Sequence, residues 1–232
     1  MLSLDLAIID KYLKQELVLA LLMGVVLSFA VGNVNVMPSA VCAMVSIALG
    51  QTAAALDEQG GWERFRLALP LSRRDVVLGR YACGALLTAI GVVCGVVCAV
   101  LVMAAVAATS GALPNSAAIV ESFEAPTVVC CLLASAACAL LVLSVTLPLA
   151  FKMGMSAGLR FVPVVAVFAV VIVGVLMNNG DGFGLNLGPL FAAAFATPMS
   201  AAVTALAALA AAVTLYAASC AVSVKFYSAR EL

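Results

Sequence analysis

Formal charge in this chain is confined to short segments that separate long apolar runs. The stretch from Asp57 to Tyr81 alone holds nine of the 22 charged residues, and the sequence on both sides of it is almost wholly apolar. Hydrophobic residues make up 66% of the 232 and charged residues only 9%, whereas soluble chains are about a quarter charged. We therefore expect an all-α integral membrane protein with a single transmembrane domain.

The N-terminal segment differs in pattern from the apolar run that follows it. Leucine or isoleucine recurs every three or four residues from Leu2 to Leu17, while Asp5 and Asp10 occupy other faces, which is typical of an amphipathic helix on the membrane surface. We expect an interfacial helix over residues 2–16. The first span follows at 17–36, which carries no charge and has close to the ~20 residues that a bilayer requires.

Five further apolar runs are long enough to complete a six-span protein. They cover residues 39–56, 81–108, 127–150, 161–178 and 200–224. Residues 57–80 are expected to form a loop between the second and third spans. Residues 183–197 are apolar but interrupted by glycine and Pro189, so we expect a re-entrant or interfacial segment on the outer side of the membrane.

Small residues suggest where helices approach one another closely. Gly91, Gly95 and Ala99 form a stripe along the third span that is expected to contact another helix. The last span is rich in alanine and is expected to be tightly surrounded by helices. The eight cysteines lie in or beside apolar runs without a Cys-x-x-Cys pair, and we assign them to packing.

All basic residues fall on one side of a six-span topology. By the positive-inside rule that side is cytoplasmic, so both termini and the stretch at 57–80 should face the cytoplasm. The basic residues are Lys11, Lys14, Arg64, Arg66, Arg73, Arg74, Arg80, Lys152, Arg160, Lys225 and Arg230.

Several kinds of chemistry are missing from the sequence. The chain has no histidine and a formal net charge of zero, which argues against an enzyme, a histidine-ligated metal site and nucleic-acid binding. It also lacks the Gly-x-x-x-x-Gly-Lys-Ser/Thr motif that cradles nucleotide phosphates. Any use of ATP therefore depends on another protein.

The predicted spans contain polar but no charged side chains. Serine and threonine there are expected to bond mainly within the protein's own helices. Gln51 is the best candidate for a functional polar group on a transport path, because an unpartnered buried amide costs ~1 to 3 kcal/mol. Sodium coupling through carbonyls and hydroxyls stays open. The polar residues are Gln51, Thr52, Thr88, Ser135, Thr146, Thr204, Thr214 and Tyr216.

The charged stretch is predicted to be a short helix, a stop and a second helix. Gly60 and Gly61 end the preceding span, Pro70 interrupts the chain, and Ser72 with Asp75 forms a capping-box pattern. Arg73 and Arg74 then lie in a first turn, where the helix dipole disfavours each cation by ~0.3 to 1 kcal/mol. An anionic lipid or an acidic partner surface is expected to compensate.

The stretch resembles the loop after the second span in ABC-2 type transporter permeases, particularly the small six-span subfamily of bacterial exporters. The resemblance consists of short motifs within about 25 residues. Outside them it concerns only the order and number of the spans. The residues that carry it are Asp57-Glu58, Gly61-Trp62-Glu63-Arg64, Leu69-Pro70-Leu71-Ser72-Arg73 and Val77-Leu78-Gly79-Arg80-Tyr81.

This resemblance implies a subunit of the bacterial inner membrane that pairs with a second permease chain, identical or paralogous. In that family the loop forms a coupling helix that docks on a separate cytoplasmic subunit, which binds ATP and magnesium, so this chain needs no cofactor of its own. A weaker second contact would lie between Lys152 and Arg160. The implied contact residues are Glu58, Trp62, Glu63, Arg64 and Phe65, with Arg73 and Arg74 close by.

We therefore expect the permease of an ATP-driven exporter. The alternatives are a non-transporting scaffold, an immunity-type membrane protein or a secondary transporter. The direction of transport follows from the resemblance alone. Nothing in the residues identifies the cargo.

Overall fold

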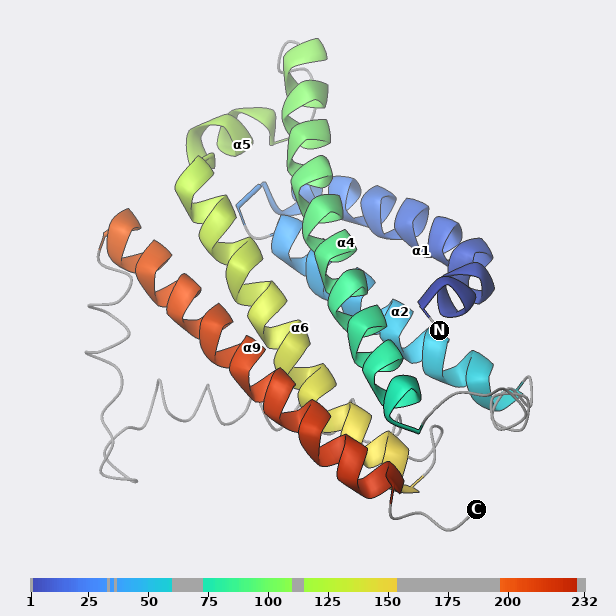
Figure 1. Ribbon diagram of the computed structural model, residues 1–232. Helices are drawn as coiled ribbons and strands as arrows, with labels where there is room; N and C mark the ends of the chain where they lie inside the picture. The colour runs from blue at the N-terminus through green and yellow to red at the C-terminus, as the bar shows by residue number, and fades with distance from the viewer. Residues whose placement is uncertain are drawn as a thin grey trace, which may run out of the picture.

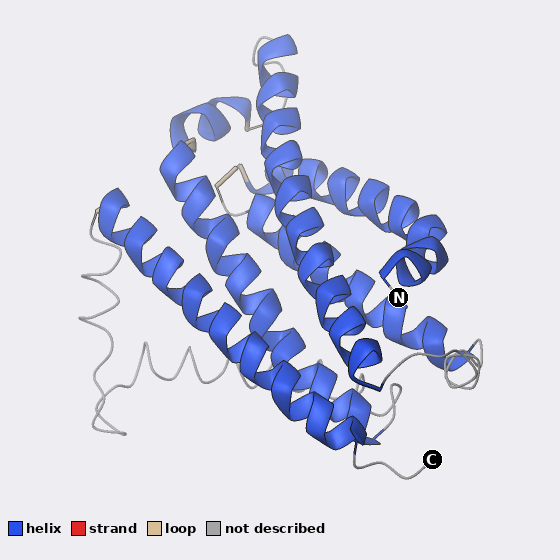
Figure 2. Ribbon diagram, viewed as in Figure 1, coloured by secondary structure: helices blue, strands red, loops and turns tan. Residues whose placement is uncertain are grey.

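The computed structural model describes residues 2–32, 34–35, 37–59, 73–109, 115–153 and 197–228, and within these ranges all regular structure is helical (Figure 2). The prediction of an all-α membrane protein is thus confirmed at this level. The predicted span at 161–178 lies outside the described residues, as does the outer segment at 183–197 except for Thr197. Residues 60–72 of the charged stretch also lie outside them.

The N-terminus forms one helix where the sequence predicted two segments. Helix α1 runs without interruption over Leu2–Val31, and its apolar part covers Leu13–Val31. No glycine or proline lies near residue 16, so nothing breaks the backbone between the amphipathic and apolar parts. The helix ends at Gly32, whose φ of +72° is left-handed and favours glycine.

Four more long helices complete the described bundle. They are α2 (Met37–Gln59), α4 (Arg73–Ala108), α6 (Ala125–Met153) and α9 (Pro198–Ser228). Helices α1, α4, α6 and α9 each contain a stretch long and apolar enough to cross a membrane. Within the part of α2 whose side chains are described, Met37–Gly50 is apolar and overlaps the predicted span at 39–56.

Small residues bring α2 and α4 into close contact. A Cβ atom at Gly91 would lie 2.8 Å from the carbonyl oxygen of Cys42, and one at Gly95 would lie 2.6 Å from that of Pro38. Ala99 is buried in the same region of the core. The pairing runs in opposite directions along the two chains, so α2 and α4 are antiparallel (Figure 1). The predicted small-residue contact is confirmed.

Helices α6 and α9 are parallel neighbours. Leu209 of α9 packs near Leu132 and Ala136, and ten residues further along α9 the hydroxyl of Ser219 reaches the carbonyl oxygen of Ser144. Residue numbers therefore increase together along both helices, as Figure 1 shows. The end of α6 and the start of α9 consequently lie at opposite ends of the bundle.

The described part of α9 is less enclosed than the sequence predicted. Ala205, Ala212 and Tyr216 are buried toward the bundle, but Ala207, Ala208, Ala210 and Ala211 are exposed within the described chain. The expected enclosure of α9 by helices on all sides is therefore not seen among the described residues of this single chain. The reason is geometric: α6 and α4 pack on one side of α9, and alanine content does not specify a direction.

The segment between the third and fourth predicted spans contains a helix that the sequence pattern did not reveal. Helix α5 covers Ser116–Ser122, and only seven residues are too few to show helical periodicity. Asn115 precedes it with a φ of 60°, and its side-chain amide donates to the carbonyl of Phe29 at 2.9 Å. The amide of Asn35 donates to the Ser122 carbonyl. These two asparagines attach α5 to the turn between α1 and α2.

Cysteines contribute mainly to packing, as predicted. Cys42, Cys83, Cys94, Cys98 and Cys130 are buried in the described bundle, and none of the eight cysteines there forms a disulfide.

Candidate functional site

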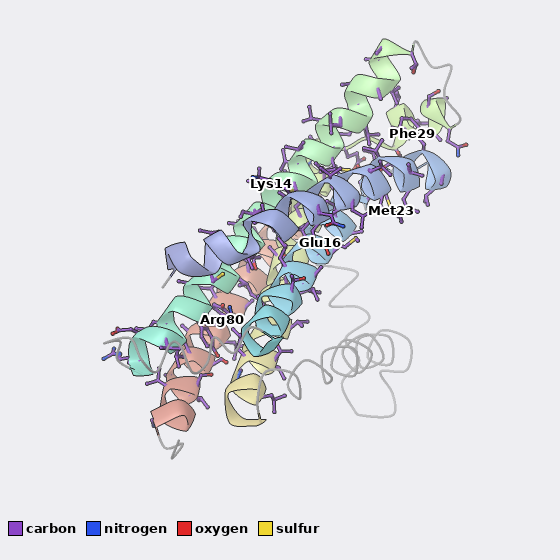
Figure 3. The ribbon with its side chains drawn as sticks, turned by 90° about the vertical axis from the view of Figure 1, so that its right-hand side faces the viewer. Lys14, Glu16, Met23, Phe29 and Arg80 are labelled. Atoms are coloured by element: carbon purple, nitrogen blue, oxygen red, sulfur yellow. The ribbon has the colours of Figure 1, made fainter. Side chains whose placement is uncertain are left out.

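Most of the described basic residues gather at one end of the helix bundle. This basic end comprises the N-terminal part of α4 and the C-terminal parts of α2, α6 and α9, at the lower right of Figure 1, whereas α1 begins farther up the bundle. Among the described residues, the opposite end carries Glu121 and Glu124 and neither lysine nor arginine. The basic residues at this end are Arg73, Arg74, Arg80, Lys152 and Lys225; Lys11 and Lys14 belong to α1, and Figure 3 shows Lys14 nearer the middle of the bundle. Among the described helices, the end with Glu121 and Glu124 therefore lacks basic residues, as predicted.

The described members of the predicted contact flank the segment between α2 and α4 at this basic end. Glu58 lies in the last turn of α2, and Arg73 and Arg74 open α4. The side chain of Arg74 is exposed. Trp62, Glu63, Arg64 and Phe65 lie outside the described residues, so their roles stay predictions.

Gln51 lies in α2 directly after Gly50, at which a Cβ atom would meet the Leu143 side chain of α6 at 3.3 Å. Residue 51 therefore follows directly after the position at which α2 contacts α6. The function of Gln51 as a path-lining group stays a prediction.

The first turns of α4 are built into the bundle rather than projecting from it. Arg80 is only 5% exposed, and Figure 3 shows it among the helices, whereas Lys14 and Glu16 lie along α1. Val76, Val77 and Tyr81 belong to one core cluster with residues of α6 and α9. The later part of α4, including Leu87, Cys94 and Val102, packs instead with α1 and α2. Helix α4 therefore joins two packing clusters.

A hydrogen-bonded group of four side chains and the backbone carbonyl of Ser144 lies inside the bundle next to this basic end. We call it the Tyr81 cluster; it consists of Tyr81, Ser144, Tyr216, Ser219 and Ser223. The Tyr81 hydroxyl lies 2.8 Å from the hydroxyls of both Ser219 and Ser223, and the Tyr216 hydroxyl donates to the Tyr81 carbonyl at 2.7 Å. The two tyrosine rings are 4.8 Å apart between centroids. This cluster links α4, α6 and α9.

Sequence reasoning missed most of the Tyr81 cluster. It named Tyr216 as one polar residue within a span, but Tyr81 was placed at the edge of the charged stretch. A usable signal was present, because Tyr216, Ser219 and Ser223 recur at helical spacing on one face of an otherwise apolar helix. Gly84 provides the space: a Cβ atom there would lie 2.6 Å from the Tyr216 hydroxyl.

Most other polar residues in the described spans bond to their own helix. The hydroxyls of Thr88, Ser135 and Thr146 donate to Gly84, Leu132 and Leu143 of the same helix at 3.0, 2.8 and 3.4 Å. Thr204 and Thr214 do the same within α9. The predicted bonding within the protein's own helices is confirmed for these five residues. In the described residues no group of three or more metal-ligating side chains comes together.

A bundle of long apolar helices with most of its described basic residues at one end defines a multi-pass α-helical membrane protein. The family model described as "ABC-2 family transporter protein" matches residues 1–228. The chain therefore belongs to the ABC-2 transporter family, as the resemblance of its charged stretch indicated. Neither the curated proteins nor the solved structures include a significant match to it.

Members of this family are membrane components of transporters that work with a cytoplasmic ATP-binding subunit. The membrane chain is a transport component and is not itself the catalytic one.

Proposed function

We propose that this chain is the permease subunit of an ATP-driven exporter and that it works as a dimer, either with a second copy or with a paralogue. A separately encoded subunit binds ATP and magnesium and docks on the stretch between α2 and α4. In this proposal Glu58, Trp62, Glu63, Arg64 and Phe65 form the contact, with Arg73 and Arg74 beside it. The proposal rests on the family and on the charge arrangement of the described helices.

The observation that carries the proposal is the position of the two helix ends that flank the stretch. The C-terminus of α2 and the N-terminus of α4 both lie at the basic end of the bundle. Positive residues concentrate on the cytoplasmic side of membrane proteins. A docked ATPase would therefore reach the stretch from the cytoplasm, and both chain termini would lie on that side.

The parallel arrangement of α6 and α9 supports an even number of spans. Since α6 ends at the basic end and α9 begins at the opposite end, the chain between Met153 and Thr197 has to return across the bundle. Such a return agrees with the predicted span at 161–178 and with six spans in total. Lys152, at the end of α6, then lies where the weaker second ATPase contact is proposed.

The packing of α4 suggests how force would be transmitted. Closure of the ATPase subunits would displace the stretch and with it the first turns of α4. Those turns pack on α6 and α9, while the later part of α4 packs on α1 and α2. A tilt of α4 would thus shift the two packing clusters relative to each other and change the side to which the path between two permease chains opens.

Co-purification tests the proposal directly. Tagged protein extracted from its native membrane in mild detergent is expected to retain an ATP-binding subunit, identified by mass spectrometry, with measurable ATPase activity. Arg64→Glu is expected to reduce retention at least tenfold, because it reverses a charge at the proposed contact. The matched control is Arg230→Glu, the same reversal in the C-terminal tail, which should retain the partner.

Absence of any ATP-binding subunit in the wild-type preparation would contradict the proposal and favour a scaffold or immunity-type protein. Equal retention by Arg64→Glu and wild type would contradict the assigned contact residues.

A further inference from the structure

Helix α6 contains a proline near its basic end. Pro148 lies inside the helix, five residues before Met153. A helical proline has no N–H to donate to the carbonyl four residues earlier, and its ring also presses on that carbonyl. The carbonyl of Ser144 therefore lacks its intrahelical donor. In a membrane, such a freed carbonyl requires a partner from elsewhere in the protein.

Helix α9 provides that partner. The hydroxyl of Ser219 donates to the Ser144 carbonyl oxygen. This bond joins two helices through residues that are 75 positions apart in the chain. The side chain of Ser144 is not involved, because its own hydroxyl donates to Leu141 at 2.7 Å. The contact thus concerns the backbone position that the proline exposes.

Proton counting gives the remaining hydrogen bonds a direction. A serine hydroxyl has one proton to donate, and that of Ser219 goes to the Ser144 carbonyl. In its 2.8 Å contact with Ser219, Tyr81 must therefore be the donor. The single Tyr81 proton is then used as well, so Ser223 must donate in its 2.8 Å contact with Tyr81. The order runs Ser223 to Tyr81 to Ser219 to the Ser144 carbonyl.

We propose that this hydrogen-bonded chain is a mechanical joint that ties the first turns of α4 to the proline-weakened site of α6 through α9. This inference rests on the proposed function, in which the ATPase pushes α4, and it adds the route by which that motion reaches α6. Tyr81 and Ser219 are positioning residues in this joint. Hydrogen bonds, unlike apolar contacts, are directional, so the joint favours one registry of the three helices.

The position of the joint makes it suitable for this role. Tyr81 lies eight residues after Arg73, where the charged stretch enters α4. Ser223 is fully buried, Tyr81 is 4% exposed and Ser219 is half-buried, so the bond between Tyr81 and Ser223 in particular is shielded from water. Pro148 supplies the weak point at which the end of α6 can tilt. The Tyr216 bond to the Tyr81 carbonyl holds the same turn of α4 from a second direction.

A double-mutant cycle on the chain alone tests the joint without any partner. In Ser219→Ala, amide hydrogen exchange in α6 beyond Pro148 is expected to accelerate about tenfold, since an unsatisfied carbonyl destabilises that segment. Pro148→Ala restores a backbone N–H that can donate to the Ser144 carbonyl. Adding Ser219→Ala to the Pro148→Ala variant should therefore have little further effect on exchange. The control Ser144→Ala removes a hydroxyl but keeps the carbonyl, and should exchange like wild type. Equal acceleration by Ser219→Ala in both backgrounds would overturn the joint.

A second experiment uses the complex with its ATPase subunit in lipid nanodiscs. Hydrogen exchange is compared without nucleotide and with ATP plus vanadate. In wild type, the nucleotide is expected to change exchange at the start of α4 and at the ends of α6 and α9. In Tyr81→Phe the change should persist at α4 but fall at least threefold in α6 and α9.

The outcomes separate the two proposals. If no ATPase subunit binds or nucleotide changes nothing in the wild-type chain, the proposed function fails while the double-mutant cycle still reports on the joint. If Tyr81→Phe transmits the nucleotide effect to α6 and α9 undiminished, the joint fails as a coupling device and the proposed function stands.

Discussion

The hydroxyl of Tyr216 donates to the backbone carbonyl of Tyr81 at 2.7 Å, which joins two helices 135 residues apart. The tyrosine passes over Gly84, whose missing side chain leaves room for the hydroxyl. Both residues lie inside the bundle, close to the end at which α4 begins. The relationship shows that this end is fixed by polar contacts between helices as well as by apolar packing.

Removal of the Tyr216 hydroxyl should weaken the bundle modestly. Tyr216→Phe keeps the ring contact with Tyr81 and loses one hydrogen bond, so we expect a loss of ~0.5 to 1.5 kcal/mol in unfolding free energy. Thermal or denaturant unfolding in detergent measures it. Thr214→Val serves as the control, because among the described residues that hydroxyl bonds to Ala211 of its own helix. Identical stabilities for Tyr216→Phe and the control would contradict the assignment.

A methyl group at Gly91 should be poorly tolerated. Its Cβ atom would lie 2.8 Å from the Cys42 carbonyl oxygen and 2.5 Å from the Ser46 hydroxyl, so α2 and α4 would have to separate. We expect Gly91→Ala to cost ~1 to 3 kcal/mol. Gly50→Ala is the control, since its nearest neighbour is a flexible Leu143 side-chain atom at 3.3 Å. A Gly91→Ala variant as stable as Gly50→Ala would show that the two helices are not in this contact.

The two asparagines at the end opposite the basic residues should hold α5 in place. Asn35→Ala removes the donor to Ser122 and the acceptor for the Glu124 amide at 3.2 Å. We expect faster hydrogen exchange over residues 115–124, by about fivefold, with little change in the transmembrane part of α4. Asn115→Gly tests the second attachment, because glycine keeps the φ of 60° while the side-chain amide is lost. Unchanged exchange in both variants would refute this role.

The sole tryptophan of the chain offers a test of topology. Trp62 is expected to face the cytoplasm, so its fluorescence in purified, oriented proteoliposomes should be quenched by iodide added on that side and not by iodide added on the other. Orientation is established independently with a tag on the C-terminus. Quenching from the opposite side would place the charged stretch outside the cell and would remove the basis for an ATPase contact.

The broad class of this protein could be predicted from its sequence, and particular residues show why. Runs without charge, such as that after Leu17, have no stable place in water and require a membrane. Gly91, Gly95 and Ala99 indicated a helix contact, because a spacing of four residues places small side chains on one face of a helix, where another helix can approach closely. The motif around Trp62 and Pro70 indicated the family that the match over residues 1–228 now establishes.

Other features depended on neighbours that sequence patterns do not specify. The alanines of α9 predicted enclosure on all sides, yet several are exposed, because alanine content gives no direction. Helix α5 is too short for periodicity to reveal it. Serine and threonine look alike in sequence whether they bond within a helix, as Thr88 does, or across helices, as Ser219 does.

The sequence by itself determined the environment, the helical character and the side on which charge gathers, since transfer free energies and backbone hydrogen bonding depend mainly on local composition. Only the tertiary structure decided that Tyr81, Ser219 and the proline-freed carbonyl of Ser144 meet. Their meeting depends on the register of three helices that are far apart in the chain. That register is set by the packing of the whole bundle, and no single segment encodes it.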